Sequence, residues 1–214
     1  MILGRTHSEN LMPMIKDAFE KNNLSLNDID LIVCDIGPGS FTGIRIGIAT
    51  VKAFYDSLDI PCIGISSLEA LAYNTSNSNL VCSILDAKND NCYFALYEKK
   101  ENYYEELIEP QAETIDSAIS ILKSYLDDNF ENAEITFVGD GAISFKEYIK
   151  ESFEYVDFVE STSNTLNSYN LGICGFRKYQ NGDLLDKEIL PLYLKKPQAQ
   201  KLLEEKLKDM NNNG

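Results

Sequence analysis

The sequence has no tryptophan, a single histidine at position 7, and few cations for its size. One histidine cannot supply the paired imidazoles of a common metal site, and it leaves most serine or cysteine triads without a base. The 19 lysines and arginines stand against 34 acidic residues, which gives a net charge of -15. Such a surface repels polyphosphates at long range, so we expect any nucleic acid to be held mainly by a partner.

Long apolar runs and paired cysteines are missing as well. No run reaches the roughly 18 to 20 residues that span a bilayer, and the start "MILGRTHSEN" lacks the apolar core of a signal peptide. The five cysteines are scattered and show no C-x-x-C spacing, which argues against a disulfide framework and a zinc cluster. We expect a soluble cytoplasmic protein with no metal site, no membrane contact and buried cysteines.

The first third of the chain alternates between helical and strand patterns. Apolar residues recur at helical spacing over 7–22, the run Leu31–Ile36 reads as a buried strand, and a helix follows it. A second strand ends near residue 66, and Ser66 or Ser67 caps the next helix. This alternation predicts an α/β fold of two lobes, with mixed sheets flanked by helices and a boundary between 1–76 and 77–214.

The rest of the chain predicts a hairpin and further helices. We expect paired strands over 80–87 and 92–98, and a helix over 114–126 that Thr114 or Asp116 caps. A strand, glycine turn and helix follow over 135–149, then a strand over 155–160 and a helix that Gly182 closes. The final elements are a strand over 189–196 that Pro191 breaks, and a helix over 198–210.

The stretch "DIGPGSFTGIRIGIATVKAF", residues 35–54, places a glycine-rich corner between a strand and a helix. A helix N-terminus presents free backbone N–H groups and a positive dipole end, which suit an anion. The candidate phosphate contacts are Gly37, Gly39, Ser40, Thr42 and Arg45. The spacing matches neither a P-loop nor a dinucleotide fingerprint, so a purely structural corner stays the alternative.

The helix after this corner carries a stripe of small residues. Gly43 and Gly47 are four residues apart, and Thr50 follows about one turn later. Such spacing allows another helix to approach closely. We find no catalytic group of side chains, since Asp86, Asp90 and Asp140 are expected in turns, where short carboxylates bind local backbone donors.

Six segments, taken in order, resemble the TsaB (YeaZ) family of bacterial tRNA threonylcarbamoyladenosine synthesis: "RTHSENLMPMI", "IGPGSFTGIRIGIATVKAF", "IPCIGISSLEALA", "LDAKNDNCYFALYE", "FVGDGA" and "LPLYLKKP". The resemblance implies an actin-like ATPase (ASKHA, ribonuclease-H-like) fold with a degenerate nucleotide site. It further implies a non-catalytic subunit that pairs with the catalytic paralogue TsaD, while the ATPase TsaE docks on that pair. tRNA would be bound only through the complex.

The resemblance also implies an interface and a limited cofactor requirement. The first helix and the helix after the glycine corner would face TsaD, or a second copy of this chain when TsaD is absent. Carried over by motif, that face includes Leu11, Ile15, Ala18, Gly43 and Gly47. No tightly bound cofactor is implied, and ATP or ADP at the interface with the partner stays open.

One departure from the family concerns the N-terminus. Family members begin with an apolar strand ending in Asp-Thr-Ser and further strands, whereas Met1 here stands just ahead of "RTHSEN". We therefore expect the first lobe to lack its opening strands, and the run Leu31–Ile36 to present an open apolar edge. A form extended upstream is expected to be more stable.

Two enzyme classes are the competing interpretations. A stand-alone ATP-dependent small-molecule kinase of the same superfold would use residues 37–42 on ATP, but no convincing general base accompanies them. A peptidase would need Ser40 or Ser66 beside His7, a geometry that we do not expect.

Overall fold

The computed structural model describes residues 7–75, 78–160, 164–182 and 189–195. Its elements follow one another in the order α1 (His7–Asn22), η1 (Leu26–Asp28), β1 (Ile32–Gly37), α2 (Phe41–Leu58), β2 (Cys62–Ser66), α3 (Ser67–Ala72), β3 (Leu80–Asp86), β4 (Asn91–Lys99), β5 (Tyr104–Thr114), α4 (Ile115–Asn129), β6 (Ile135–Val138), α5 (Asp140–Ser144), α6 (Lys146–Ser152), β7 (Val156–Phe158) and α7 (Ser168–Gln180). The predicted α/β class is confirmed. The boundary between residues 76 and 77 stays a prediction.

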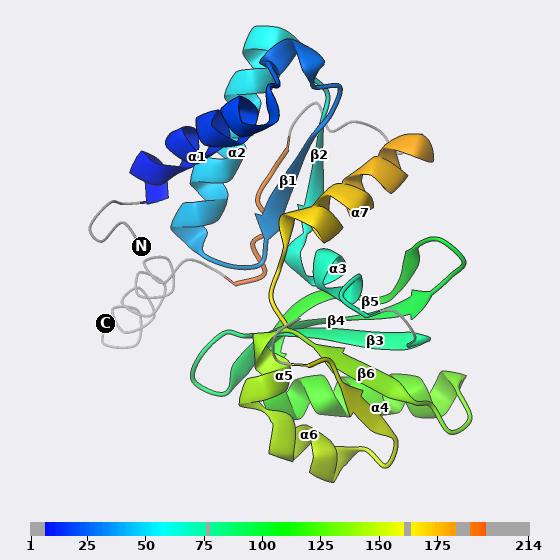
Figure 1. The fold of residues 1–214 in the computed structure, drawn as a ribbon. Coiled ribbons are helices and arrows are strands. Elements are labelled where there is room, and N and C mark those ends of the chain that lie inside the picture. The colour runs from blue at the N-terminus through cyan, green and yellow to red at the C-terminus, as the bar shows by residue number, and fades with distance from the viewer. Residues whose placement is uncertain (1–6, 76–77, 161–163, 183–188, 196–214) are drawn as a thin grey trace, which may run out of the picture.

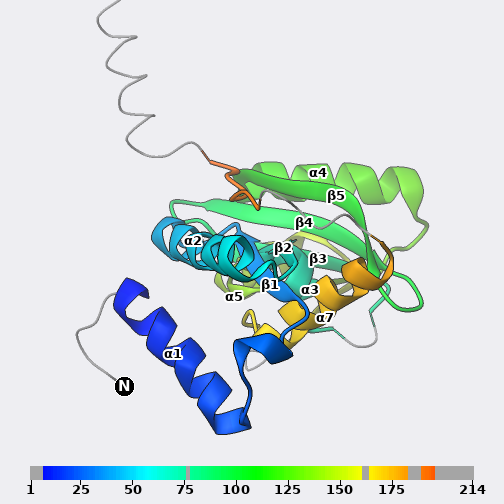
Figure 2. The same cartoon turned by 90° about the horizontal axis from the view of Figure 1, so that it is seen from above.

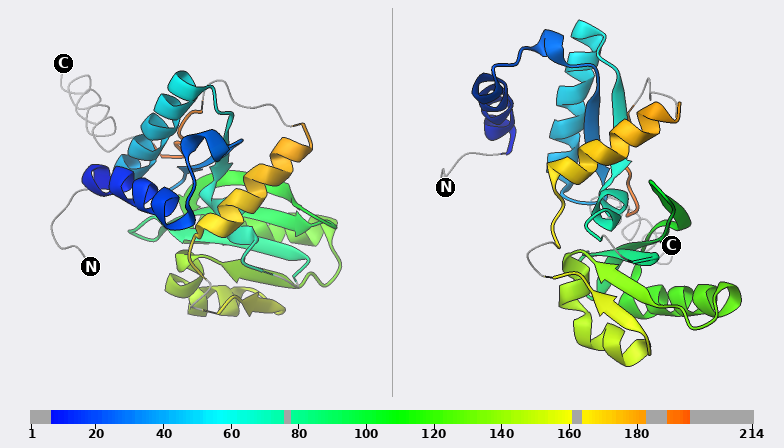
Figure 3. Two further views of the ribbon diagram at one scale, coloured as in Figure 1. Left: turned by 45° about the horizontal axis from the view of Figure 1, so that its top comes forward. Right: turned by 45° about the vertical axis from the view of Figure 1, so that its right-hand side comes forward.

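Two sheets organise the described chain (Figure 1). The parallel pair β1–β2 carries α2 on one face and α7 on the other, as Figure 3 shows. The second sheet is mixed and has the order β5-β4-β3-β6-β7, in which β6 runs parallel to β3 and β7. Helix α3 lies between the two sheets and contacts both.

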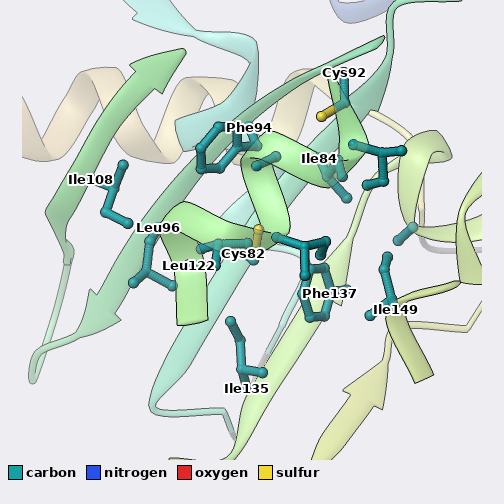
Figure 4. Close-up of a cluster of buried hydrophobic side chains, with 14 of the residues drawn as sticks. Cys82, Ile84, Cys92, Phe94, Leu96, Ile108, Leu122, Ile135, Phe137 and Ile149 are labelled. Atoms are coloured by element: carbon teal, nitrogen blue, oxygen red, sulfur yellow. The ribbon is translucent and has the colours of Figure 1, made fainter. Parts of the chain in front are cut away.

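The larger core lies between the mixed sheet and α4, α5 and α6. Alternate residues of β3 and β4 point into it, among them Ile84 and Phe94, and they meet Leu122 of α4. Figure 4 shows these side chains with Phe137 and Ile149 in one cluster. Because the opposite face of the same strands packs on α3, β3 and β4 are buried on both sides, which explains their continuous apolar sequence.

Several local predictions are confirmed. Helix α1 has the expected bounds, and β3 and β4 form the expected antiparallel hairpin. Ser66, rather than Ser67, caps α3 by accepting a hydrogen bond from the Leu68 amide. Thr114, rather than Asp116, caps α4 by accepting one from Ser117. All five cysteines are buried free thiols.

One strand was not foreseen, and two expectations were wrong. Strand β5 was not foreseen, because its sequence is rich in glutamate and contains Pro110; as an edge strand it tolerates both. The segment 189–195 is not a strand, although the Leu192 amide donates a hydrogen bond to the Ile36 carbonyl. The helix expected before residue 149 is interrupted at Phe145, between α5 and α6. The helix predicted over 198–210 lies outside the described residues.

Candidate functional site: a glycine corner beside an apolar groove

The glycine corner joins β1 to α2, and its own side chains bind its backbone. The Gly37 amide donates a 2.8 Å hydrogen bond to Oδ1 of Asp35. The Gly43 amide donates a 3.3 Å hydrogen bond to the Ser40 hydroxyl, which is the N-cap of α2. Gly37 has φ of +100°, a backbone conformation that favours glycine.

Asp35 is the residue at this corner that sequence reasoning missed. Its carboxylate also accepts a 2.7 Å hydrogen bond from the Ser67 hydroxyl at the start of α3. Burial raises the pKa of Asp35, while the hydrogen bonds from Ser67 and Gly37 act in the opposite direction. Parallel strands bring their carboxyl ends together, which is why the end of β1 meets the start of α3.

Arg45 is held by two aromatic rings instead of standing free. Its guanidinium lies 4.0 Å from the centre of the Phe41 ring, and its Nε donates a 2.7 Å hydrogen bond to the Tyr193 hydroxyl. Tyr193 in turn stacks on Phe41. No sequence pattern linked Tyr193 to this helix, because the two residues are 148 positions apart.

The structure therefore brings the five candidate phosphate residues to one end of α2, and it occupies several of their polar groups. Gly39, Ser40 and Thr42 are exposed, whereas Gly37 is buried. Since the carboxylate of Asp35 already accepts from the Gly37 amide, an anion would have to approach beside a carboxyl group. Phosphate contact at this corner stays a prediction.

An apolar groove of about 560 Å³ runs from this corner between α1, β1 and α2. Helix α1 contacts α2, and the view from above shows the two helices diverging over most of the length of α1 (Figure 2). Leu11 and Ile15 of α1 line the groove on one side, and Gly43 and Gly47 of α2 line it on the other. Four of the five predicted interface residues thus share one surface. Ala18 is exposed on α1 and does not line the groove.

The groove is also lined by apolar side chains that were not among the predicted interface residues. They are Phe19, Leu26, Ile29, Leu31, Ile32, Val33, Ile44, Val51 and Phe54. Their positions could not be read from sequence, because each also fits an ordinary buried core. Asp35, Gly39 and Ser40 line the end of the groove nearest the corner. The groove and the candidate phosphate site are therefore continuous.

The two glycines of α2 have free space at the groove. A Cβ built on Gly43 would lie 3.4 Å from Ser40, and one built on Gly47 would lie 3.9 Å from the Cys34 sulfur. Neither glycine is required for packing within the described chain. The stripe of small residues instead leaves room at the surface for a side chain or helix of a partner.

Of the three acidic residues expected in turns only Asp90 lies in one, because Asp86 belongs to a strand and Asp140 to a helix. Asp86 ends β3, and Asp140, the first residue of α5, accepts a 2.9 Å hydrogen bond from the Asp86 amide. The Lys88 ammonium and amide bind the Asp86 carboxylate, and these contacts lower its pKa. Within the described ranges no three histidine, cysteine or acidic residues are arranged to hold a metal ion.

Comparison with known proteins places the chain in a family. The model of the family described as TsaD, tRNA N6-adenosine threonylcarbamoyltransferase, matches residues 1–203. The chain belongs to this TsaD family. The predicted resemblance to TsaB is also confirmed, since several curated relatives carry that name.

Several of the curated relatives are named tRNA threonylcarbamoyladenosine biosynthesis protein TsaB. The protein from Bacillus subtilis is 31% identical over 150 residues, which cover 70% of this chain and 63% of the relative. The protein from Escherichia coli is 34% identical over 101 residues, 46% of this chain and 44% of the relative. The chain thus spans less than two thirds of the length of these two relatives. The Haemophilus influenzae protein is 28% identical over 202 residues, which cover 89% of this chain and 80% of the relative.

Solved structures support the fold. YeaZ from Pseudomonas aeruginosa superposes with a TM-score of 0.71 at 22% identity, and the match covers 91% of this chain and 87% of that one. A second structure, described as an uncharacterized protein with similarity to peptidase YEAZ from Pseudomonas aeruginosa, gives a TM-score of 0.73 at 21% identity with the same coverage. Among the described residues, no helix is both long and apolar enough to cross a bilayer.

Proposed function

We propose that the chain is a non-catalytic subunit of the complex that attaches threonylcarbamoyl to the adenosine beside the anticodon of tRNA. It acts by pairing with the catalytic paralogue TsaD. The observation that carries this proposal is the apolar groove along α1 and α2, in which Leu11, Ile15, Gly43 and Gly47 face one another. The reaction is proposed because the chain belongs to the TsaD family and has relatives named TsaB.

The composition of the groove suits a protein partner. Apolar side chains line most of it, and the glycines allow close backbone approach. Met12 and Met14 extend the apolar surface of α1 into solvent, with 50% and 67% of their surface exposed. Large exposed apolar patches are typical of association surfaces, and methionine adapts its shape to a partner. We propose that a helix of TsaD binds in this groove.

The same groove is the proposed contact between two copies of the chain when TsaD is absent. A symmetric pair would bury the exposed part of α1 against itself. Light scattering of the isolated chain over a range of concentrations is expected to report a dimer. Addition of TsaD should replace this dimer by a one-to-one pair, because the two partners compete for the same groove.

The non-catalytic role is supported by how the corner uses its polar groups. The Ser40 and Ser66 hydroxyls each accept a hydrogen bond from a backbone N–H and cap a helix, which gives both serines a structural role. ATP or ADP is proposed only at the interface with TsaD, where Gly39 and Ser40 form the end of the groove. The alternative is a stand-alone kinase. Turnover of ATP by the isolated chain, abolished by Thr42→Val, would favour it.

The remaining proposals concern the other partners. The net charge of -15 disfavours direct tRNA binding, so TsaD is expected to make most of the tRNA contacts in the cytoplasm. TsaE is the proposed second protein partner, docking on the pair.

The test is reconstitution of modification. TsaD, TsaE, the enzyme that supplies the activated threonylcarbamoyl group, and unmodified tRNA are combined with and without this chain. We expect modified adenosine only when the chain is present, and no product from the chain without TsaD. Equal product in its absence would overturn the proposal. Product formed by the chain without TsaD would show that it is catalytic.

A further inference from the structure

A second cavity lies on the far side of α7 from the apolar groove. It has a volume of about 350 Å³ and is bounded by α3, by α7 and by the face of β4 and β5 that points away from α4. Its polar lining comes from Glu69, Tyr73, Tyr97, Glu106, Arg177 and Lys178. An adjoining polar hollow of about 480 Å³ shares Tyr103, Arg177 and Asn181 with it. Figure 1 shows the β4–β5 turn rising toward the end of α7.

The charged groups of this cavity are only partly paired. The Lys178 ammonium lies 2.8 Å from the Glu69 carboxylate. Glu106 and Arg177 line the same cavity, and neither makes an ion pair within the described ranges. Arg177 rests over the Tyr73 ring, 5.3 Å from its centre, which fixes the guanidinium on the α7 wall. Burial raises the pKa of Glu106, and the nearby Lys178 acts in the opposite direction. Arg177 also contacts the Tyr73 hydroxyl, but among the described residues neither Glu106 nor Arg177 has an ion pair of its own.

A buried hydroxyl group points to the same place. Tyr97 is directly opposite Glu106 in the β4–β5 register, so both side chains lie on the cavity face. Tyr97 is 1% exposed, and its hydroxyl makes no hydrogen bond of ordinary geometry among the described residues, although Ser66 lies near it. The neighbouring Tyr104 hydroxyl is satisfied by Thr75. A buried hydroxyl without a partner is costly and marks a site for a ligand or water.

We propose that this cavity binds a small zwitterion of the α-amino-acid class. Its carboxylate pairs with Arg177, its ammonium pairs with Glu106, and the Tyr97 hydroxyl bonds to a polar atom of the ligand. The planar guanidinium is the cation best suited to a carboxylate. The lining has two acidic and two basic side chains, so its charges cancel and a nucleotide polyphosphate would gain little.

The size of the cavity agrees with this class of ligand. Small-molecule sites begin at about 300 Å³, and 350 Å³ leaves room for an amino acid and a few waters. Glu106 is exposed and Arg177 is half-buried, so the ligand enters from solvent at the rim of the cavity. The site is separate from the α1–α2 groove, so it does not depend on the proposed pairing with TsaD.

The test begins with thermal unfolding of the full chain in the presence of each standard L-amino acid. At least one is expected to raise the midpoint in a saturable manner. The best binder is then compared by calorimetry with its N-acetyl and amide derivatives, each of which lacks one charge. Both should bind about tenfold or more weakly. Absence of any saturable binder, or equal affinity for either derivative, would overturn the proposal.

Variants assign the contacts. Glu106→Gln and Arg177→Gln should each weaken binding of the amino acid by about tenfold or more, whereas Glu134→Gln and Lys150→Gln, which lie outside the cavity, should not. Tyr97→Phe removes only the unpartnered oxygen atom. It should weaken binding several-fold while the ligand-free protein unfolds at the same or a higher temperature. Unchanged affinity in all three cavity variants would contradict the assignment.

Discussion

The Ser67 hydroxyl donates a 2.7 Å hydrogen bond to the Asp35 carboxylate and so ties the start of α3 to the end of β1. Ser67 itself is 4% exposed. Its replacement by alanine leaves the partly buried carboxylate of Asp35 with one donor fewer, which costs about 1–3 kcal/mol of unfolding free energy. We therefore expect Ser67→Ala to lower stability by that amount in urea unfolding. Ser120→Ala on the exposed side of α4 is the control. Equal loss in both variants would show that the bond to Asp35 is not responsible.

The stability of the chain should depend on pH through Asp35. Burial raises the pKa of this carboxyl in the folded state, so between its unfolded and folded pKa values the folded state binds more protons. Stability therefore falls as pH rises through this window, which starts near the unfolded value of about 3.9. Asp35→Asn cannot titrate, and it should gain stability relative to the parent as pH rises from about 4 to 7. The unfolding free energy of both proteins is measured at several pH values in this range. The same pH dependence for the parent and for Asp35→Asn would contradict this prediction.

Two glycines of α7 should respond in opposite ways to the same change. A Cβ on Gly175 would lie 2.6 Å from Cγ1 of Val33 on β1, whereas a Cβ on Gly172 would meet nothing within 4 Å. Gly175→Ala should lower stability by about 1–3 kcal/mol through overpacking. Gly172→Ala should raise it by up to about 1 kcal/mol, since alanine favours a helix interior. Thermal unfolding of both variants tests the packing of α7 on β1. A higher midpoint for both variants would contradict this packing.

The elements that sequence predicted well are those with one clear periodicity. Helix α1 shows apolar residues at regular spacing and has the predicted bounds, and the hairpin β3–β4 has turn residues between two apolar runs. Strand β5 lacks such a pattern, because the exposed residues Glu105, Glu106 and Glu109 interrupt its apolar residues without regular alternation. The segment 189–195 is apolar for a different reason, as Ile189 packs between α2 and β1 without joining a sheet.

The candidate site was predictable only in part. The glycine corner and the small stripe of α2 stand next to each other in sequence, so their proximity followed from the pattern. The bond from Ser67 to Asp35 and the stacking of Tyr193 on Phe41 join residues far apart in the chain, and no periodicity reports them. The close approach of α7 was missed for the same reason, because Gly172 and Gly175 look equivalent until the fold places Val33 beside one of them.

The most direct test of the central claim is light scattering of the chain mixed with TsaD, carried out with the parent and with Gly43→Leu combined with Gly47→Leu. Both positions have space at the groove, so the variant should remain folded while its new side chains fill the docking surface. Gly172→Leu is the matched control, because a Cβ added at this position of α7 meets nothing within 4 Å. We predict a stable one-to-one pair for the parent and the control, and an affinity lower by about tenfold or more for the double variant. Unchanged pairing of a folded double variant would contradict the account.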